Sequence, residues 1–169
     1  GGANYTSTLT GGLWNDKGNI ETTSQDAQSV GIKIGSYGVV PRIQNDGDIL
    51  ATTRDTTSNS LTGAAGTKGG DAYGVLIDPL GSVSSFTNTG RMIVTAQGPT
   101  SNAYGVIDQS GTLTSFTNTG FMNNVLQLGG TGKLYAVDLR ANTTGVTFSN
   151  TGTIVGDVYF GSGNNNVSV

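Results

Sequence analysis

FTNTG at residues 86–90 decides the fold, because FTNTG returns at residues 116–120 and FSNTG at residues 148–152. Looser copies, WNDKG and IQNDG, occupy residues 14–18 and 43–47. The intervals between the final glycines of these copies, Gly18, Gly47, Gly90, Gly120 and Gly152, are 29, 43, 30 and 32 residues. A repeat near this length is typical of solenoids, in which each repeat contacts only its neighbours.

A second motif precedes the aromatic position of four copies by 12 or 13 residues. It reads SVGI, AYGV, AYGV and LYAV at residues 29–32, 72–75, 103–106 and 134–137. Each repeat thus holds three short strands: one at this motif, one ending near the aromatic residue, and one after the glycine. The sequence predicts an all-β, right-handed parallel β-helix of about five three-stranded rungs that forms a single domain over residues 1–169.

Equivalent positions of the repeats test this prediction, because they stack in columns in a β-helix. The column two residues after the glycine is apolar throughout: Ile20, Ile49, Met92, Met122 and Ile154. The column four residues before the glycine is also apolar: Trp14, Ile43, Phe86, Phe116 and Phe148. Both columns are expected to be buried. The residues that follow the tyrosines are small and would fill little of a core: Gly74, Gly105 and Ala136. We therefore expect the tyrosine side chains themselves to point inward.

A polar column lies two residues before the glycine. Stacked amides can hydrogen-bond along the axis of such a structure, as they do in cross-β stacks. We therefore expect a structural ladder made of Asp16, Asn45, Asn88, Asn118 and Asn150.

Composition excludes several classes of function. The chain has no cysteine and no histidine, which removes disulfides, the usual zinc sites and Ser/His catalysis. Its net charge is −3 and its eight basic residues are scattered, so nucleic-acid binding is not expected. The segment GSGNNNV at residues 161–167 offers amides where a calcium-binding glycine-rich repeat needs carboxylates. We expect neither a metal site nor a cofactor.

The Asn-Thr-Gly turns followed by an apolar strand, together with the segment at residues 156–167, resemble autotransporter passenger domains. These are the β-helical exported regions of type V secretion proteins of Gram-negative bacteria. The resemblance implies a secreted or cell-surface location, with an outer-membrane translocator barrel outside this chain. It also implies that the chain is a fragment of a longer passenger, and the lack of cysteine agrees with that family.

The leading hypothesis from the sequence is an adhesin or an adhesin stalk. Residues 51–70 form an insertion whose charged residues are Arg54, Asp55 and Lys68, and insertions in solenoids become loops, often on a binding face. The alternative is a tolerated loop with no partner. Expected partners are a host or bacterial surface protein or glycan. Self-association is a further possibility, because neither terminal rung resembles a cap that would block its strand edges.

A polysaccharide-degrading enzyme or tailspike-like domain is the second hypothesis. Asp78, Asp108 and Asp138 recur near the end of the first strand, and glycoside hydrolysis uses two carboxylates. Turn formation explains two of these positions without catalysis, and Glu21 is the only glutamate, so no enzymatic activity is predicted. An ice-binding solenoid is less favoured, because the threonines beside the ladder are not regular in every rung.

Overall fold

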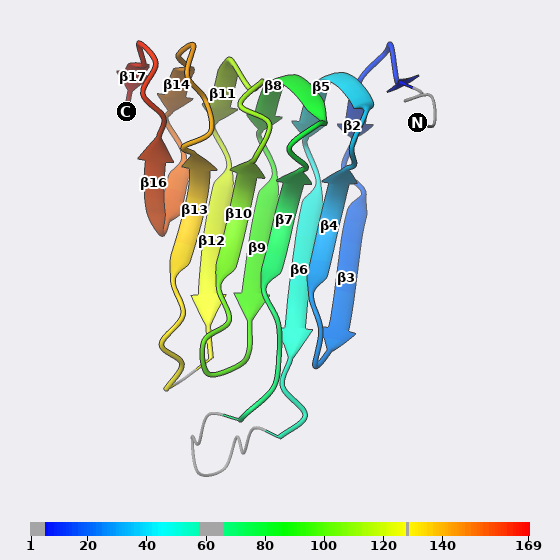
Figure 1. The fold of residues 1–169 in the computed structure, drawn as a ribbon, viewed down its shortest axis with the longest axis vertical. Helices are drawn as coiled ribbons and strands as arrows, with labels where there is room; N and C mark the ends of the chain where they lie inside the picture. The colour runs from blue at the N-terminus through cyan, green and yellow to red at the C-terminus, as the bar shows by residue number, and fades with distance from the viewer. Residues whose placement is uncertain (1–5, 58–65, 128) are drawn as a thin grey trace, which may run out of the picture.

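The structure is a computed structural model that describes residues 6–57, 66–127 and 129–169. Its strands form three sheets, and every strand pairing is parallel. Figure 1 shows the strands side by side along one axis, with the N-terminus and the C-terminus at opposite ends of the stack. This arrangement confirms the predicted parallel β-helix.

The three sheets are named here A, B and C. Sheet A contains β1 (Ser7–Thr8), β2 (Leu13–Asn15), β5 (Gly38–Asn45), β8 (Ser82–Asn88), β11 (Ser115–Asn118), β14 (Thr147–Asn150) and β17 (Asn166–Ser168). Sheet B contains β3 (Asn19–Gln25), β6 (Asp48–Arg54), β9 (Arg91–Ala96), β12 (Phe121–Leu126) and β15 (Thr153–Val155). Sheet C contains β4 (Ser29–Ile34), β7 (Ala72–Ile77), β10 (Ala103–Asp108), β13 (Leu134–Leu139) and β16 (Asp157–Phe160).

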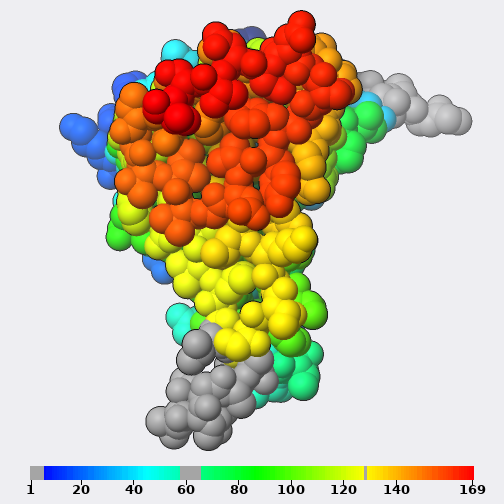
Figure 2. Space-filling view, turned by 90° about the vertical axis from the view of Figure 1, so that its left-hand side faces the viewer, coloured from blue at the N-terminus to red at the C-terminus, as the bar shows by residue number. Residues whose placement is uncertain are grey.

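The chain visits the sheets in the repeating order C, A, B. Within the described residues, four rungs run through all three sheets: β4–β6, β7–β9, β10–β12 and β13–β15. The strands β1–β3 and β16–β17 add partial turns at the two ends. In Figure 2, which looks at the C-terminal side of the stack, the last residues, in orange and red, lie over that end.

Side chains in register fill the core. Met92 pairs with Ile49 on one side and Met122 on the other, and all three are fully buried. Ile20 and Ile154 continue this column at the two ends and are partly buried. A phenylalanine column, formed by Phe86, Phe116 and Phe148 in sheet A, stacks with ring centroids 5.2 and 4.8 Å apart. Burying side chains of this size contributes roughly 1.5–3 kcal/mol each.

The first rung departs from the expected columns. Leu13, rather than Trp14, pairs with Ile43 and packs against the core, while Trp14 pairs with Gln44 and is 60% exposed. The reason is one extra residue in the turn, because Asn15 stands three residues before Gly18 and the later asparagines stand two before their glycines. Lys17 adopts a positive φ of 55° in this longer turn. Trp14 is therefore an outer residue.

The tyrosines also differ from expectation, since they lie on the outer side of sheet C. Along β7, Ala72, Val75 and Ile77 are fully buried, whereas Tyr73 is only partly buried. The regular alternation of inner and outer side chains along this strand is therefore interrupted at Gly74. A Cβ atom at Gly74 would lie 2.7 Å from the sulfur of Met92. Only a small residue therefore fits on the inside at this position, where Gly74, Gly105 and Ala136 lie, and the tyrosine ring is outside.

The insertion begins later than the sequence suggested. Strand β6 continues to Arg54, so residues 51–54 belong to sheet B and the loop follows them. Of the expected loop, residues 58–65 lie outside the described residues.

Candidate functional site

The base of the inserted loop is held by Asp55, a buried residue. Its carboxylate accepts hydrogen bonds from the backbone N–H of Thr57 at 2.8 Å, the hydroxyl of Thr57 at 2.5 Å and the backbone N–H of Lys68 at 3.1 Å. Burial alone would raise the pKa of Asp55, but these donors hold it below its usual value. The geometry makes Asp55 a structural anchor of the loop.

Of the two basic candidates in the loop, Lys68 is tied to a neighbouring turn. Its ammonium lies 3.5 Å from the carboxylate of Asp26, which also accepts bonds from the hydroxyl of Thr56 at 2.6 Å and its backbone N–H at 2.9 Å. These bonds lower the pKa of Asp26, the Thr56 hydroxyl most of all. Arg54 is exposed at the end of β6. In the described part of the loop, Asp55 thus holds the base, Lys68 also pairs with Asp26, and Arg54 is exposed.

The predicted polar ladder forms, with one replacement. Asn15 takes the place expected for Asp16, which is exposed, because of the longer first turn. Each amide nitrogen donates to the side-chain oxygen of the next rung, at 2.7 Å, 2.8 Å, 2.7 Å and 2.7 Å. This asparagine ladder consists of Asn15, Asn45, Asn88, Asn118 and Asn150. Its members are mostly buried, and its role is structural.

The three aspartates considered for catalysis do not share a face. Asp108 pairs with Ile77 and is buried, where it accepts hydrogen bonds from Ser110, Gly111 and Leu113. Asp138 instead pairs with Ile107, on the outer side of sheet C, and binds Arg140. Asp78 follows the end of β7 and lies 3.2 Å from the ammonium of Lys33. Each of these carboxylates therefore has its own local partners.

The most regular feature of the outer surface is a tyrosine column, formed by Tyr73, Tyr104 and Tyr135 in sheet C. The ring centroids are 4.9 and 4.7 Å apart, and neighbouring rings are within 5° of parallel. Tyr159 of β16 extends the column, tilted by 49° at 5.6 Å from Tyr135. Because each ring covers the face of the next, the column presents ring edges and hydroxyl groups to solvent.

Charged groups border this column. Arg140 lies over the rings of Tyr135 and Tyr159, with its guanidinium carbon 5.5 and 4.9 Å from their centroids. Two hydrogen bonds of 2.9 and 2.6 Å connect it to Asp138. These bonds raise the pKa of Arg140, which stays charged. A guanidinium held between a carboxylate and aromatic rings is a stable arrangement, since cation–π attraction adds to the ion pair.

The other end of the column is acidic. The hydroxyl of Tyr73 donates to Asp71 at 3.2 Å, and burial together with this carboxylate raises the pKa of Tyr73. The same two causes raise the pKa of Tyr104 to about 12. Both phenols therefore remain protonated donors at neutral pH. The sequence motif AYGV placed these tyrosines in one column, but only the neighbouring Met92 and Gly74 show that they face outward.

Trp14 forms a second exposed aromatic feature, on the outer side of sheet A. Its indole N–H donates to Asp46 at 2.6 Å, and the same carboxylate accepts bonds from Gln44 at 2.7 Å and Thr89 at 2.6 Å. The donors, Thr89 first and Trp14 second, lower the pKa of Asp46. One ionised carboxylate thus fixes the edge of the indole ring.

Asp46 also lines an open depression of about 420 Å³ at the turns between sheets A and B, called here the turn trough. Its lining residues are Lys17, Gly18, Asn19, Asp46, Gly47, Asp48, Gly90 and Arg91. The guanidinium of Arg91 binds Asp48 through two hydrogen bonds of 3.2 and 2.7 Å, which lower the pKa of that carboxylate.

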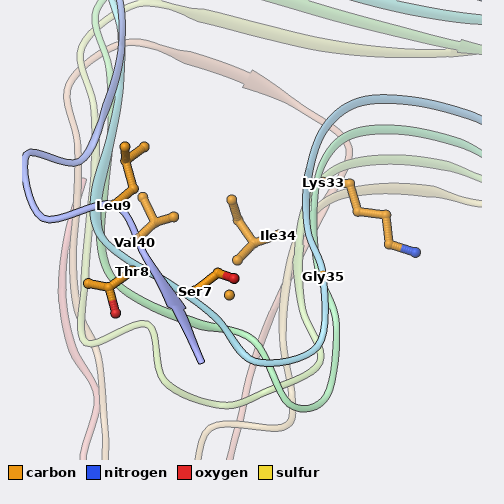
Figure 3. Close-up of a pocket in the computed structure, with 8 residues that line it drawn as sticks. Ser7, Thr8, Leu9, Lys33, Ile34, Gly35 and Val40 are labelled. Atoms are coloured by element: carbon orange, nitrogen blue, oxygen red, sulfur yellow. The ribbon is translucent and has the colours of Figure 1, made fainter. Parts of the chain in front are cut away.

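A smaller depression of about 290 Å³ lies at the N-terminal end of the stack. Figure 3 shows Ser7, Leu9, Ile34 and Val40 around it, while the amino group of Lys33 points away. Its lining is mixed, with Ser7 and Thr8 beside the apolar Leu9, Ile34 and Val40.

In the described ranges, no group of three or more acidic side chains is placed to hold a metal ion. The same ranges contain no helix long and apolar enough to cross a bilayer.

Comparison with known proteins identifies no relative. No protein-family model, curated protein or solved structure matches the chain.

Proposed function

We propose that the chain is a non-catalytic attachment scaffold, a β-helical passenger segment that works as an adhesin or adhesin stalk. The observation that carries this proposal is the tyrosine column, an ordered row of half-buried aromatic side chains on the outer side of sheet C. Tyrosine is favoured in protein contact surfaces because it offers a large apolar body and a polar tip at low conformational cost.

The interior supports a scaffold role. The asparagine ladder and the phenylalanine column join every complete rung to the next through side chains as well as backbone. A rod built in this way keeps its outer side chains in fixed positions, which lowers the entropy lost when a partner binds. The proposed partner is a host or bacterial surface protein or glycan.

The proposed location is the surface of a Gram-negative bacterium or its surroundings, with export through a translocator barrel outside this chain. The supports are the repeat pattern and the absence of cysteine in the sequence. A polysaccharide-degrading activity has less support, since Asp78, Asp108 and Asp138 occupy different columns and bind local partners.

Adhesion of beads coated with the protein to cells, matrix proteins and glycan surfaces tests this proposal. The double variant Tyr104→Ala/Tyr135→Ala is expected to reduce attachment strongly. The matched control is Thr87→Ala/Thr117→Ala, which changes half-buried outer residues on sheet A of adjacent rungs. Equal attachment by both variants and the unaltered protein would contradict a contact through the tyrosine column.

The contribution of the loop is tested by deleting residues 58–65. The backbone N–H of Thr67 donates to the hydroxyl of Thr57 at 2.8 Å, so the two cut ends already lie together, and Asp55 is retained. We expect the deletion variant to attach normally. If this deletion alone abolishes attachment, the contact surface lies on the loop and not on the tyrosine column. If no version of the protein attaches, the segment acts only as a stalk.

A further inference from the structure

Trp14 is the only tryptophan of the chain, and it is 60% exposed. Trp14 points outward because side chains alternate along a strand and its neighbours Leu13 and Asn15 both face the interior. Its position is also fixed, because the bond from its N–H to Asp46 connects it to the next rung. A ring that is both exposed and immobilised is suited to receive a ligand without a further entropy cost.

The turn trough provides polar groups next to this ring. Asp46 belongs to both features, since it fixes Trp14 and lines the trough. Gly18, Gly47 and Gly90 also line the trough, where the backbones of successive turns are so close that a Cβ atom at Gly47 or Gly90 would clash with the carbonyl oxygen of the preceding glycine. Its volume of about 420 Å³ is within the ~300–1,000 Å³ range of small-molecule sites.

The chemistry of the trough indicates the class of ligand. Lys17 and Arg91 carry two positive charges, and Asp46 and Asp48 carry two negative charges, so the lining has no net charge. It offers donors and acceptors in similar numbers, together with the side-chain amide of Asn19. A matching ligand has many hydroxyl groups, which both donate and accept hydrogen bonds. It carries them on a ring with apolar C–H faces.

We propose that Trp14 and the turn trough form a binding site for a neutral, hexose-containing glycan. The indole ring packs against one sugar ring, and the polar groups of the trough bind hydroxyls of the adjoining sugar. This inference rests on the proposed attachment function and names the ligand class, while placing the glycan on a different face from the tyrosine column.

The single tryptophan gives a direct test. The full chain is titrated with soluble neutral oligosaccharides of glucose, galactose or mannose, and separately with oligosaccharides of uronic acids, while indole fluorescence is recorded. At least one neutral oligosaccharide is expected to change the fluorescence saturably, and the acidic ones to bind more weakly. The absence of any saturable change across the neutral panel would overturn the proposal.

Variants assign the binding to the site, with calorimetry as the measurement because the fluorophore is changed. Trp14→Ala is expected to lower affinity at least about tenfold, or by 1.4 kcal/mol. Trp14→Phe keeps an aromatic face and is expected to lose less. Leu80→Ala, which removes another exposed apolar side chain at 56% exposure, is the matched control and should bind normally. Unchanged affinity in Trp14→Ala would overturn the proposal.

The same variants separate this proposal from the attachment function. If Trp14→Ala loses both oligosaccharide binding and bead attachment to glycan surfaces, the glycan site is supported. If the oligosaccharide binds equally well to Trp14→Ala while beads still attach through the tyrosine column, the attachment function stands and the glycan site at Trp14 is wrong.

Discussion

Two aromatic columns run along this solenoid with nearly equal spacing and lie on opposite sides of the backbone. Ring centroids are 5.2 and 4.8 Å apart in the phenylalanine column, and 4.9 and 4.7 Å apart in the tyrosine column. The phenylalanines are almost completely buried, while the tyrosines are half-buried. The comparison teaches that the repeat sets the spacing of a column, whereas the side chains across the core decide on which side it lies.

The largest expected difference between the columns is the effect of removing a ring. Phe116 is fully buried between Phe86 and Phe148, so Phe116→Ala leaves a cavity and should cost about 3–5 kcal/mol of unfolding free energy. Tyr104→Ala loses two outer stacking contacts of about 0.5–1.5 kcal/mol each, a total near 2 kcal/mol. Denaturant unfolding of both variants measures the difference. Equal losses of unfolding free energy would mean that the tyrosine column stabilises the fold as much as the phenylalanine column does.

Exchanging the hydroxyl group sharpens the comparison. Phe116→Tyr places a hydroxyl in a fully buried position among apolar side chains, which should cost about 1–3 kcal/mol. Tyr104→Phe removes a hydroxyl from the outer column and should change stability by less than about 0.5 kcal/mol. Melting temperatures of the two single variants measure these effects. A larger loss for Tyr104→Phe than for Phe116→Tyr would reverse the assigned sides.

The last expected effect is confined to alkaline pH, where stability depends on the ionisation of the tyrosine column. Burial and Asp71 raise the pKa of Tyr104 from 10.0 to about 12, so its neutral form is favoured in the folded chain. The free energy of unfolding that this pKa shift contributes is therefore fully present below pH 10 and is lost as the pH rises toward 12. Absorbance of tyrosinate during alkaline titration measures this step, and Tyr104→Phe should remove it. Titration of every tyrosine near pH 10 would contradict the half-buried column.

The sequence was sufficient to predict the parallel β-helix and most of its columns. FTNTG and its copies are regular because each column must keep its spacing. A charged residue in place of Met92, for example, would disturb both of its neighbours in the column, Ile49 and Met122. Local pattern and tertiary structure therefore agree in these rungs.

Three details could not be read from the sequence. The turn at residues 15–18 contains one more residue than its equivalents, so counting back from Gly18 assigned Trp14 and Asp16 to the columns that Leu13 and Asn15 occupy. The side of the tyrosine column depends on Met92, which belongs to another strand. Asp108 and Asp138 have similar local contexts but differ by one residue in register, which puts Asp108 on the inner side of sheet C and Asp138 on its outer side, buried against Arg140.

Of the candidate sites, the loop residues were identified by an irregular interval, and the asparagine ladder by a repeated column. The tyrosine column was visible as a motif but was assigned to the core. Trp14 with the turn trough was missed altogether, because Lys17, Asp48 and Arg91 come from different rungs and meet only after the strands stack.

The asparagine ladder has a direction, since in each of its four bonds the amide nitrogen of one asparagine donates to the side-chain oxygen of the next one toward the C-terminus. Each rung therefore offers the same acceptor on one side and the same donor on the other, and rungs are interchangeable parts. Duplication or loss of one complete repeat would leave no amide unsatisfied and would change the length of the rod by roughly 4.8 Å. A gene encoding such a chain can adjust its reach in equal steps without redesigning its interior.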